Sequence, residues 1–179
     1  LLDGLGYEMT TLAEQGITDA IEESGDSYKQ NARLKAIAYA RLSRLTALAD
    51  DSGLEVDALN GQPGIGSARF AGEAANDADK VRLLLARLSG VSWERRTARF
   101  KCVIAIATPE GQCQICSGDC PGIIAFEPRG ENGFGYDPIF FLPELGKTMA
   151  ELPSETKNQI SHRAQASQKA RELLIQLQA

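Results

Sequence analysis

Residues 45–58 of the chain read LTALADDSGLEVDA, two short apolar runs on either side of the quartet Asp50-Asp51-Ser52-Gly53. Apolar runs of this length, bounded by turn-forming residues, are typical of β-strands. We therefore expect short strands at 45–49 and 54–58, with the quartet where the first one ends. Two adjacent carboxylates are costly in such a place unless a positive partner neutralises them. The stretch thus predicts both a sheet and a candidate site.

A helix is expected upstream of this stretch. Ser27 followed by Gln30 matches a capping box, in which side chain and backbone satisfy each other's hydrogen-bonding groups. Apolar residues then recur at helical spacing as far as Ala40. Before this helix we expect the tail of another helix at the start of the chain, a short strand around Tyr7–Thr11 and an acidic loop at 18–26.

Downstream, helical and strand-like patterns continue. Asn76 or Asp77 caps a helix that runs through Leu88 and ends at Gly90. The elements expected after it are strands at 98–108, 113–117 and 123–127, a glycine-rich loop at 130–135 and a final helix capped by Ser161. Because helices and strands both alternate and cluster, we expect one α/β (α+β) domain over residues 1–179, built on a mixed sheet.

The composition excludes several function classes. The 179 residues are 43% hydrophobic and 24% charged, as in an average globular protein, and carry a formal net charge of −5. Broad nucleic-acid binding needs a basic face and is not expected. No apolar run approaches the roughly 20 residues that span a bilayer, and no signal peptide is visible. We therefore expect a cytoplasmic protein without a membrane partner, its four cysteines present as reduced thiols.

Acidic residues suggest a metal site. Carboxylate oxygens suit Mg²⁺, and neighbouring side chains of an extended segment point opposite ways. Asp50 or Asp51 could thus face a metal while the other orients backbone or water. The alternative is an ordinary turn at a strand end, where Asp, Ser and Gly are common. Glu22-Glu23 could add a carboxylate to the same cation, or be a solvated acidic pair.

A second candidate is the glycine-rich segment 132–138, NGFGYDP. Glycines permit close backbone approach, and aromatic faces stack on nucleic-acid bases. Phe134 and Tyr136 could therefore contact a base, while Asp137 could accept hydrogen bonds from a ring N–H or a sugar hydroxyl. The alternative is a hairpin loop whose aromatic rings fill the core.

Basic residues near the last helix form a third candidate. Lys157 and Arg163 suit a phosphate or a purine carbonyl, because a helix N-terminus already favours anions. Lys35, on the first capped helix, could reach the same phosphates or be an exposed helix lysine. His162 is the chain's single histidine, which excludes metal sites that need two. Its alternative role is a hydrogen bond at the helix start.

Four cysteines invite a zinc interpretation. Their spacing is Cys113-x-x-Cys116-x-x-x-Cys120, with Cys102 nearby, and four thiolates can close a tetrahedral site. The usual paired knuckles are missing, however, and cysteines in strands commonly act as small hydrophobic residues. We expect the second role.

Several motifs in order resemble a known family. The segments that carry the resemblance are Ser27-Tyr28-x-x-Asn31-Ala32-x-x-Lys35-Ala36, Ala49-Asp50-Asp51-Ser52-Gly53-Leu54-x-Val56, Pro63-Gly64-x-x-Ser67-Ala68-Arg69-Phe70-x-Gly72, Arg96-x-Ala98-Arg99-Phe100-x-Cys102, Gly133-Phe134-Gly135-Tyr136-Asp137-Pro138-Ile139-Phe140, and Ala150-Glu151-Leu152 with Lys157 and Ser161-His162-Arg163-Ala164. Together they cover nearly the whole chain, which is similar to the inosine triphosphate pyrophosphatase family of the bacterial dITP/XTP type.

The resemblance implies a fold and an activity. Such enzymes have an elongated mixed sheet in two lobes with flanking helices and a central nucleotide cleft. They use Mg²⁺, usually act as homodimers, and hydrolyse ITP, dITP and XTP to the monophosphate and pyrophosphate. Family members begin with a strand and a Thr-x-Asn-x-x-Lys loop that grips the triphosphate. This motif does not occur here, and Leu1 corresponds to a position partway along the helix that follows it. Lys80 stands where an Asn is expected.

The resemblance also implies roles for individual residues. Asp51 matches the general base and metal ligand, and Glu23 the second metal-binding carboxylate. This leaves Asp50 as the supporting carboxylate that orients backbone or water. Ser52 and Lys35 match triphosphate contacts. The base-binding loop matches Phe134, Gly135, Tyr136 and Asp137, and the residues that hold the purine and its 6-oxo group match Lys157, His162 and Arg163.

Two other function classes remain open from the sequence. One is a nucleotide-binding protein without turnover, and the other is a small interaction module held together by zinc. The pyrophosphatase interpretation also explains how ATP would be rejected. Donors aimed at a 6-oxo group would be left unpaired by the 6-amino group of ATP.

Overall fold

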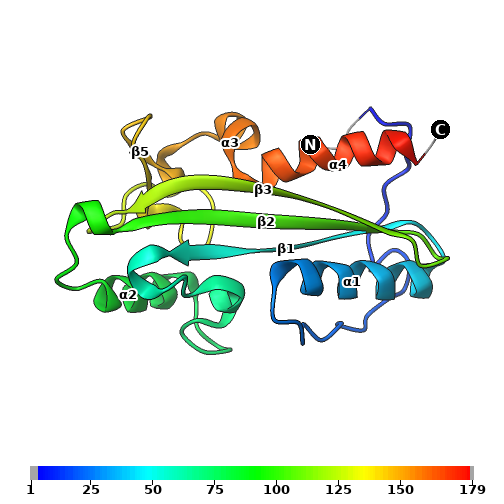
Figure 1. The fold of residues 1–179 in the computed structure, drawn as a ribbon, viewed down its shortest axis with the longest axis horizontal. Coiled ribbons are helices and arrows are strands. Elements are labelled where there is room, and N and C mark those ends of the chain that lie inside the picture. The colour runs from blue at the N-terminus through cyan, green and yellow to red at the C-terminus, as the bar shows by residue number, and fades with distance from the viewer. Residues whose placement is uncertain (1–3, 178–179) are drawn as a thin grey trace. The chain divides into compact units, whose positions relative to one another are not determined.

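The computed structural model describes residues 4–177, and the chain falls into two compact units. Unit 1 comprises Leu1–Asp51, Cys102–Gly118 and Arg163–Ala179, and unit 2 comprises Ser52–Lys101 and Asp119–His162. The helices are α1 (Tyr28–Ser43), α2 (Asp77–Arg87), α3 (Ser154–Ile160) and α4 (His162–Gln176), and the strands are β1 (Ala47–Val56), β2 (Thr97–Ala107), β3 (Cys113–Ile124), β4 (Phe140–Leu142) and β5 (Lys147–Thr148) (Figure 1).

The five strands form one sheet in chain order, β1-β2-β3-β4-β5. Antiparallel pairing places Ile123 of β3 opposite Phe141 of β4, and Phe141 opposite Thr148 of β5. Strands β1, β2 and β3 each contribute one part to unit 1 and the other to unit 2. The expected sheet with flanking helices is confirmed. Among residues 4–177, no helix is both long and apolar enough to span a membrane.

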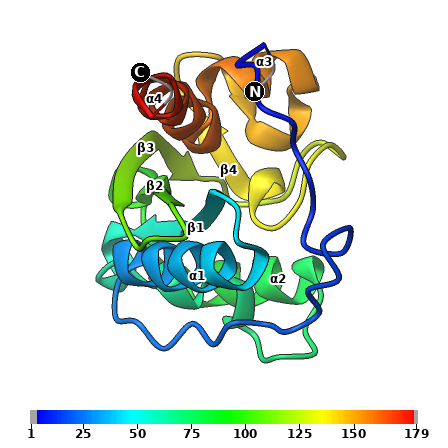
Figure 2. The ribbon, with the colours of Figure 1, turned by 90° about the vertical axis from the view of Figure 1, so that its right-hand side faces the viewer.

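In unit 1, the alternation of β2 side chains divides the core between two helices. Cys102, Ile104 and Ile106 pack against α4, whereas Ala105 and Ala107 pack against α1. Successive side chains of a strand point to opposite faces, so this division follows directly from the sequence. The two helices accordingly lie on opposite faces of the strands (Figure 2). The α1 side is lined with alanines, which bring that helix close to the strands.

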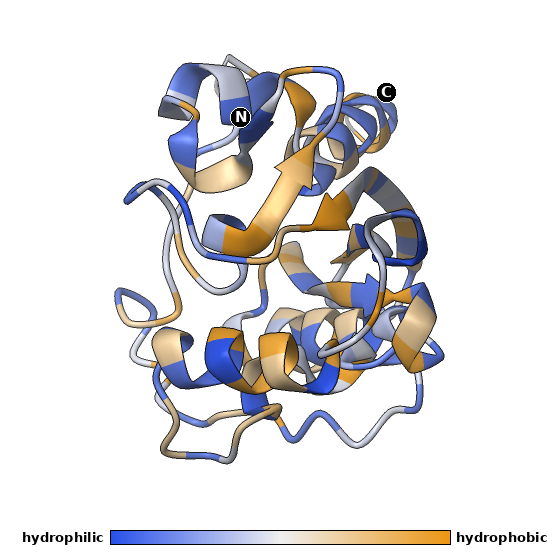
Figure 3. Ribbon diagram, turned by 90° about the vertical axis from the view of Figure 1, so that its left-hand side faces the viewer, coloured by the Kyte–Doolittle hydropathy of each residue, from blue (hydrophilic) through white to orange (hydrophobic). Residues whose placement is uncertain are grey.

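In unit 2, the core gathers apolar residues from the sheet and from α2. Leu54 of β1 and Leu84 of α2 are fully buried in it. The ring centroids of Phe100 and Phe140 lie 4.3 Å apart, slightly closer than is usual for aromatic pairs. Figure 3 shows the hydrophobic colours gathered mainly on strands and on one side of the helices, with hydrophilic colours common in the loops. This core supports the loop that carries Phe134.

All three predicted helix starts are confirmed, since α4 begins at His162, directly after Ser161. The Ser27 side chain accepts from the Gln30 amide, although the Gln30 side chain accepts from the Asp26 amide and not from Ser27 itself. Asn76 caps α2 in a complete capping box with Asp79. Caps are local interactions, which is why the sequence reveals them.

The predicted strand boundaries are partly wrong. The two short strands expected at 45–49 and 54–58 are one strand, β1, which continues through Asp50-Asp51-Ser52-Gly53. Likewise the runs at 113–117 and 123–127 belong to one strand, β3, which ends at Ile124. The turn alternative for the acidic quartet is therefore wrong. The strand continues because each carboxylate finds a partner on its own face, as described below.

The N-terminal prediction also needs correction. No strand forms around Tyr7–Thr11, and residues 4–27 contain neither helix nor strand. Instead, the Glu14 carboxylate accepts from the amide and hydroxyl of Thr11 and closes a local turn. The helix tail expected at the very start falls on residues 1–3, outside the described residues. Sequence patterns also missed α3, which is seven residues long and has no side-chain cap.

Candidate functional site

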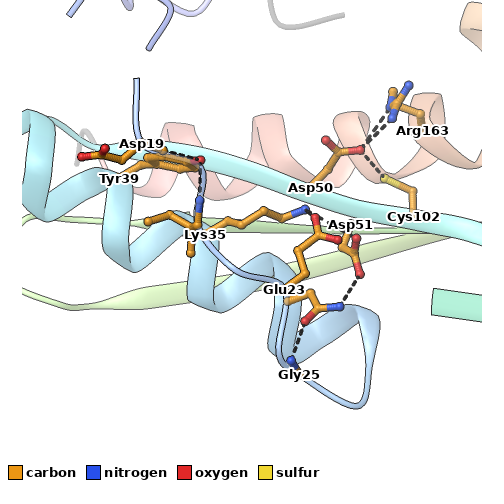
Figure 4. Close-up of polar contacts among 11 residues, drawn as sticks. Asp19, Glu23, Gly25, Lys35, Tyr39, Asp50, Asp51, Cys102 and Arg163 are labelled. Atoms are coloured by element: carbon orange, nitrogen blue, oxygen red, sulfur yellow. Dashed lines mark hydrogen bonds and ion pairs between the residues drawn. The ribbon is translucent and has the colours of Figure 1, made fainter. Parts of the chain in front are cut away.

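Two carboxylates and a lysine meet in unit 1. The Lys35 ammonium lies 2.7 Å from Glu23 Oε1 and 3.4 Å from Asp51 Oδ1, as Figure 4 shows. Asp51 comes from β1, Lys35 from α1, and Glu23 from the loop before α1. We call these three residues the carboxylate cluster. It combines three of the predicted site residues.

Asn31 joins the parts of this cluster. It is four residues before Lys35, so both side chains lie on the same face of α1. Its amide nitrogen donates to Asp51 Oδ2 at 3.2 Å, and its carbonyl oxygen accepts from the Gly25 amide at 2.9 Å. A Cβ at Gly25 would approach Asn31 Oδ1 to 2.6 Å, so glycine is required there. The fully buried Asn31 thus ties β1 to the loop that carries Glu23.

A second tie holds the same loop to α1. The Tyr39 hydroxyl lies 3.4 Å from both the Asp19 carbonyl oxygen and the Ile21 amide nitrogen (Figure 4). With Tyr39 before Glu23 and Asn31 after it, the irregular segment is fixed on both sides of the carboxylate. This explains how a segment without helix or strand can position a site residue.

Burial sets the electrostatics of the cluster. Asp51 is 8% exposed, and this burial raises the pKa of its carboxyl above the ordinary value, although Lys35 and Asn31 oppose the shift. Burial alone would lower the pKa of Lys35, but its hydrogen bond to Glu23 and the charges of Asp51 and Glu23 raise it overall. Lys35 therefore stays protonated, and Asp51 is a stronger proton acceptor than an exposed aspartate.

Asp50 points to the other face of β1. Its Oδ2 accepts from Arg163 at 2.8 Å and lies 3.8 Å from the Cys102 thiol (Figure 4). The opposite orientation of the two neighbouring carboxylates is as the strand geometry predicts. Burial raises the pKa of Cys102 to about 12, so this sulfur stays a thiol. Asp50 and Arg163 form a balanced ion pair within unit 1.

The second candidate lies in unit 2 at residues 133–137, which we call the aromatic loop. Asp137 Oδ2 is 2.5 Å from the Lys157 ammonium and accepts from the Phe134 amide at 3.3 Å. The Phe134 ring is 64% exposed, and the Lys157 nitrogen lies 5.9 Å from its centre. A Cβ at Gly133 would collide with Asp137 and Lys157, and the φ of Gly133 is +87°. The loop therefore presents one ring beside a buried ion pair.

Tyr136 has a different place from Phe134. It is 4% exposed, belongs to the core of unit 2, and its hydroxyl donates to the Ser67 carbonyl at 2.9 Å. The ring of Tyr136 thus fills the core, as the alternative interpretation of this loop has it, whereas the ring of Phe134 does not.

The remaining predicted residues divide between the units. His162 begins α4 in unit 2, with its ring stacked on Phe100 at 4.9 Å, while Arg163 belongs to unit 1. Ser52 lies in β1 and is half-buried. Lys157 lies on α3.

The zinc alternative is contradicted. Within residues 4–177, no three side chains of His, Cys, Asp or Glu are close enough together to hold a metal ion. All four cysteines are free, and they pack in three separate hydrophobic clusters. The carboxylate cluster supplies two acidic side chains. That set fits Mg²⁺, which proteins usually bind through one or two carboxylates together with substrate phosphates.

Comparison with known proteins decides the family. Residues 1–173 match the Ham1 family. The chain belongs to the Ham1 family. A dITP/XTP pyrophosphatase of Desulforamulus reducens is 51% identical over 178 residues, covering 99% of this chain and 88% of that protein. The dITP/XTP pyrophosphatase of Bacillus subtilis is 48% identical over 174 residues, covering 97% and 88%. The resemblance inferred from the motifs is confirmed.

Solved structures agree with this Ham1 assignment. The Staphylococcus aureus Ham1 protein superposes with a TM-score of 0.86 at 45% identity, covering 91% of this chain and 84% of that one. A nucleoside-triphosphatase / dITP/XTP pyrophosphatase from Mycobacterium abscessus gives a TM-score of 0.78 at 43% identity, covering 92% and 87%.

Sequence reasoning missed two residues of the candidate site region. Asn31 appeared only as part of a motif, and Asp77 only as a helix start, yet each contacts a predicted site segment. The four-residue spacing of Asn31 and Lys35 was the available signal for the first. Nothing local signals the second, because its partner is Gly135, 58 residues away.

Proposed function

We propose that this chain hydrolyses the deaminated purine nucleoside triphosphates ITP, dITP and XTP to the monophosphate and pyrophosphate, with Mg²⁺ as cofactor. The relatives at 51% and 48% identity are named dITP/XTP pyrophosphatases. The observation that carries the proposal is the carboxylate cluster, where a lysine and a buried aspartate share one site with a second carboxylate. A metal-dependent attack on a phosphate needs these groups together.

Glu23 and Asp51 would hold the metal ion. When bound, Mg²⁺ offsets the charge of the triphosphate and polarises the α-phosphorus. The two acids and Lys35 sum to a charge of −1, so the cluster has room for a cation. Lys35 and Ser52 would contact the phosphates, the lysine as a point charge and the serine as a hydroxyl donor.

Asp51 would act as the general base. It accepts a proton from the attacking water, and its raised pKa brings it nearer to the operating pH, where a base is most effective. The hydrogen bond from Asn31 fixes Asp51 Oδ2, and this also sets the direction of Oδ1. The water itself is the nucleophile, so the chain needs no covalent intermediate.

The aromatic loop would receive the base. The exposed ring of Phe134 offers a stacking face, Gly135 would let the base approach the backbone closely, and Tyr136 anchors the loop in the core through its hydroxyl. We assign selection of the purine and its 6-oxo group to Asp137, Lys157, His162 and Arg163. A 6-amino group offers a donor where the N–H groups of Lys157, His162 and Arg163 need an acceptor, and a ligand that leaves buried donors unpaired is rejected strongly.

The test is pyrophosphate release from ITP, dITP, XTP and ATP side by side, with Mg²⁺ and with a chelator. We expect Mg²⁺-dependent release from the first three and much slower release from ATP. Equal release from ATP would contradict the selectivity. Binding of ITP in a calorimeter without any release would support the second candidate, a binding protein without turnover.

We also propose, from the family resemblance, that the chain is a homodimer and acts in the cytoplasm. Light scattering of the purified chain tests the first part. A mass of one 19.3 kDa chain at micromolar concentration would contradict it.

A further inference from the structure

Asp77 makes a long-range contact that helix formation does not explain. It lies in the first turn of α2, where its Oδ2 accepts from the Gly135 amide at 2.6 Å and its Oδ1 lies 2.9 Å from the Lys80 ammonium. The hydrogen bonds from Lys80 and Gly135 lower the pKa of Asp77, so the carboxylate stays charged. Each oxygen therefore has its own partner, and one partner belongs to the aromatic loop.

The cap of α2 does not need Asp77. Asn76 accepts from the Asp79 amide at 2.9 Å, and the Asp79 carboxylate accepts from the Asn76 amide at 3.3 Å. This reciprocal pair is a complete capping box. The Asp77 side chain is 47% exposed, so it also contributes little to the core. Its contact with Gly135 is thus the feature that requires an explanation.

The contact fixes the backbone on one side of Phe134. The Gly135 amide belongs to the peptide that follows the Phe134 Cα, and the Phe134 amide belongs to the peptide that precedes it. Asp77 accepts from the first at 2.6 Å, and Asp137 accepts from the second at 3.3 Å. Both dihedral angles of Phe134 are therefore held by carboxylates, one on each side. The direction of its exposed ring depends on both.

Packing does not replace this contact. A cavity of about 450 Å³ lies at α2 and the loop, lined by Asp77, Val81, Leu85, Pro128, Gly135 and Pro138 among others. Its walls are mostly carbon, and side chains do not fill the space beside Gly135. Gly135 also has a φ of +62°, a conformation that other residues adopt at a cost. A loop with little packing on this side relies on its hydrogen bonds.

We propose that Asp77, itself oriented by Lys80, is a positioning residue that sets Phe134 for stacking on the purine base. This role rests on the proposed function of the aromatic loop as the base site. Asp77 touches neither metal nor phosphate in this scheme. Its loss is therefore expected to weaken the binding of the base and to leave the chemical step nearly intact.

The experiment compares Asp77→Ala with Asp79→Ala, a matched control that removes the carboxylate two residues along the same helix turn. Asp77→Ala should raise KM for ITP on the order of tenfold, the range expected for one hydrogen bond to a charged group, with kcat changed less than twofold. Asp79→Ala weakens the cap and should lower Tm, but should leave KM unchanged. Asp77→Asn keeps an acceptor and should lie between wild type and Asp77→Ala.

A double variant tests whether the effect passes through Phe134. In a Phe134→Ala background, Asp77→Ala should raise KM no further, because there is no ring left to position. A full tenfold rise in that background would overturn the proposal, as would an unchanged KM in the single variant. If the wild-type chain releases no pyrophosphate from ITP, the proposed function fails and this inference fails with it. Wild-type turnover with an unaffected Asp77→Ala KM removes the positioning role alone.

Discussion

The carboxylate cluster of unit 1 and the aromatic loop of unit 2 are built on the same contact, a lysine beside an aspartate, but they differ in charge. Lys35 contacts two carboxylates, Glu23 and Asp51, so that cluster has an excess negative charge. Lys157 contacts one, Asp137, and that pair is neutral beside an exposed ring. The first arrangement suits a cation with its phosphates, and the second suits a flat, uncharged base. The count of charges, more than the residue types, distinguishes the two arrangements.

The largest effect should come from removing the charge excess. Asp51→Asn keeps the shape of the side chain but removes the proposed base, and general-base catalysis is worth about 10²- to 10⁴-fold. Pyrophosphate release at saturating ITP and Mg²⁺ should fall by about that factor, while thermal unfolding shows a folded chain. Release at the wild-type rate would refute the role of Asp51 and with it the contrast drawn here.

The neutral pair should respond through stability. Lys157→Met leaves Asp137 buried without its cation, and breaking a buried pair in this way costs about 3–5 kcal/mol. The free energy of unfolding from urea titrations measures this cost. The double variant Asp137→Asn/Lys157→Met is the matched control, because it removes both charges and should recover most of the loss. A single variant as stable as wild type would show that the pair is not coupled as its geometry indicates.

The same variant should depend on pH in a defined direction. Burial already raises the pKa of Asp137, and Lys157 opposes that shift. Without Lys157 the folded-state pKa rises further above the unfolded value, so the folded chain binds a proton more tightly than the unfolded chain. The stability deficit of Lys157→Met should therefore shrink as pH falls through that raised pKa. A deficit that grows on acidification would contradict the assignment.

These two regions also show how far the sequence predicts the fold. Ser27 and Asn76 were recognisable as caps because their partners lie three residues away. The continuity of β1 was not recognisable, because it depends on Arg163, which is 113 residues from Asp50. A pair of aspartates resembles a turn until a distant cation is known to neutralise it. The short helix α3 lacks the periodic apolar residues by which a helix can be predicted from sequence.

The candidate sites, like the fold, were predictable from local residue types but not from long-range contacts. The residue types at Glu23, Lys35 and Asp51 suggested a metal and phosphate site from the sequence, and the structure brings them together. The separate places of Phe134 and Tyr136 could not be foreseen, because two aromatic residues of one loop are equivalent in the sequence pattern until their burial is known. Asn31 and Asp77 act through contacts with Asp51 and Gly135 that span 20 and 58 residues. Local sequence patterns do not predict contacts over such separations.

A smaller effect should distinguish the two aromatic residues of the loop. Phe134→Ala should weaken ITP binding by about 1–3 kcal/mol, the range measured for base stacking, and leave Tm nearly unchanged because the ring is exposed. Tyr136→Phe removes a hydroxyl that donates to the Ser67 carbonyl in the core, so it should lower stability by about 1 kcal/mol without changing affinity. Calorimetric titration and thermal unfolding measure the two quantities. Equal effects of both variants on affinity would refute the division.

The smallest effect is expected one residue from the largest. Asp50 has the same side chain as Asp51, but it faces Arg163 in a balanced pair in which both side chains are more than a third exposed. Such pairs contribute about 0.2–1 kcal/mol to stability. Asp50→Asn should therefore shift Tm only slightly and leave pyrophosphate release within a few-fold of wild type. If it abolished release as Asp51→Asn does, the two faces of β1 would act as one catalytic unit. Charge excess would then no longer explain which carboxylate does the chemistry, and the pairing of Asp50 with Arg163 would have to be part of it.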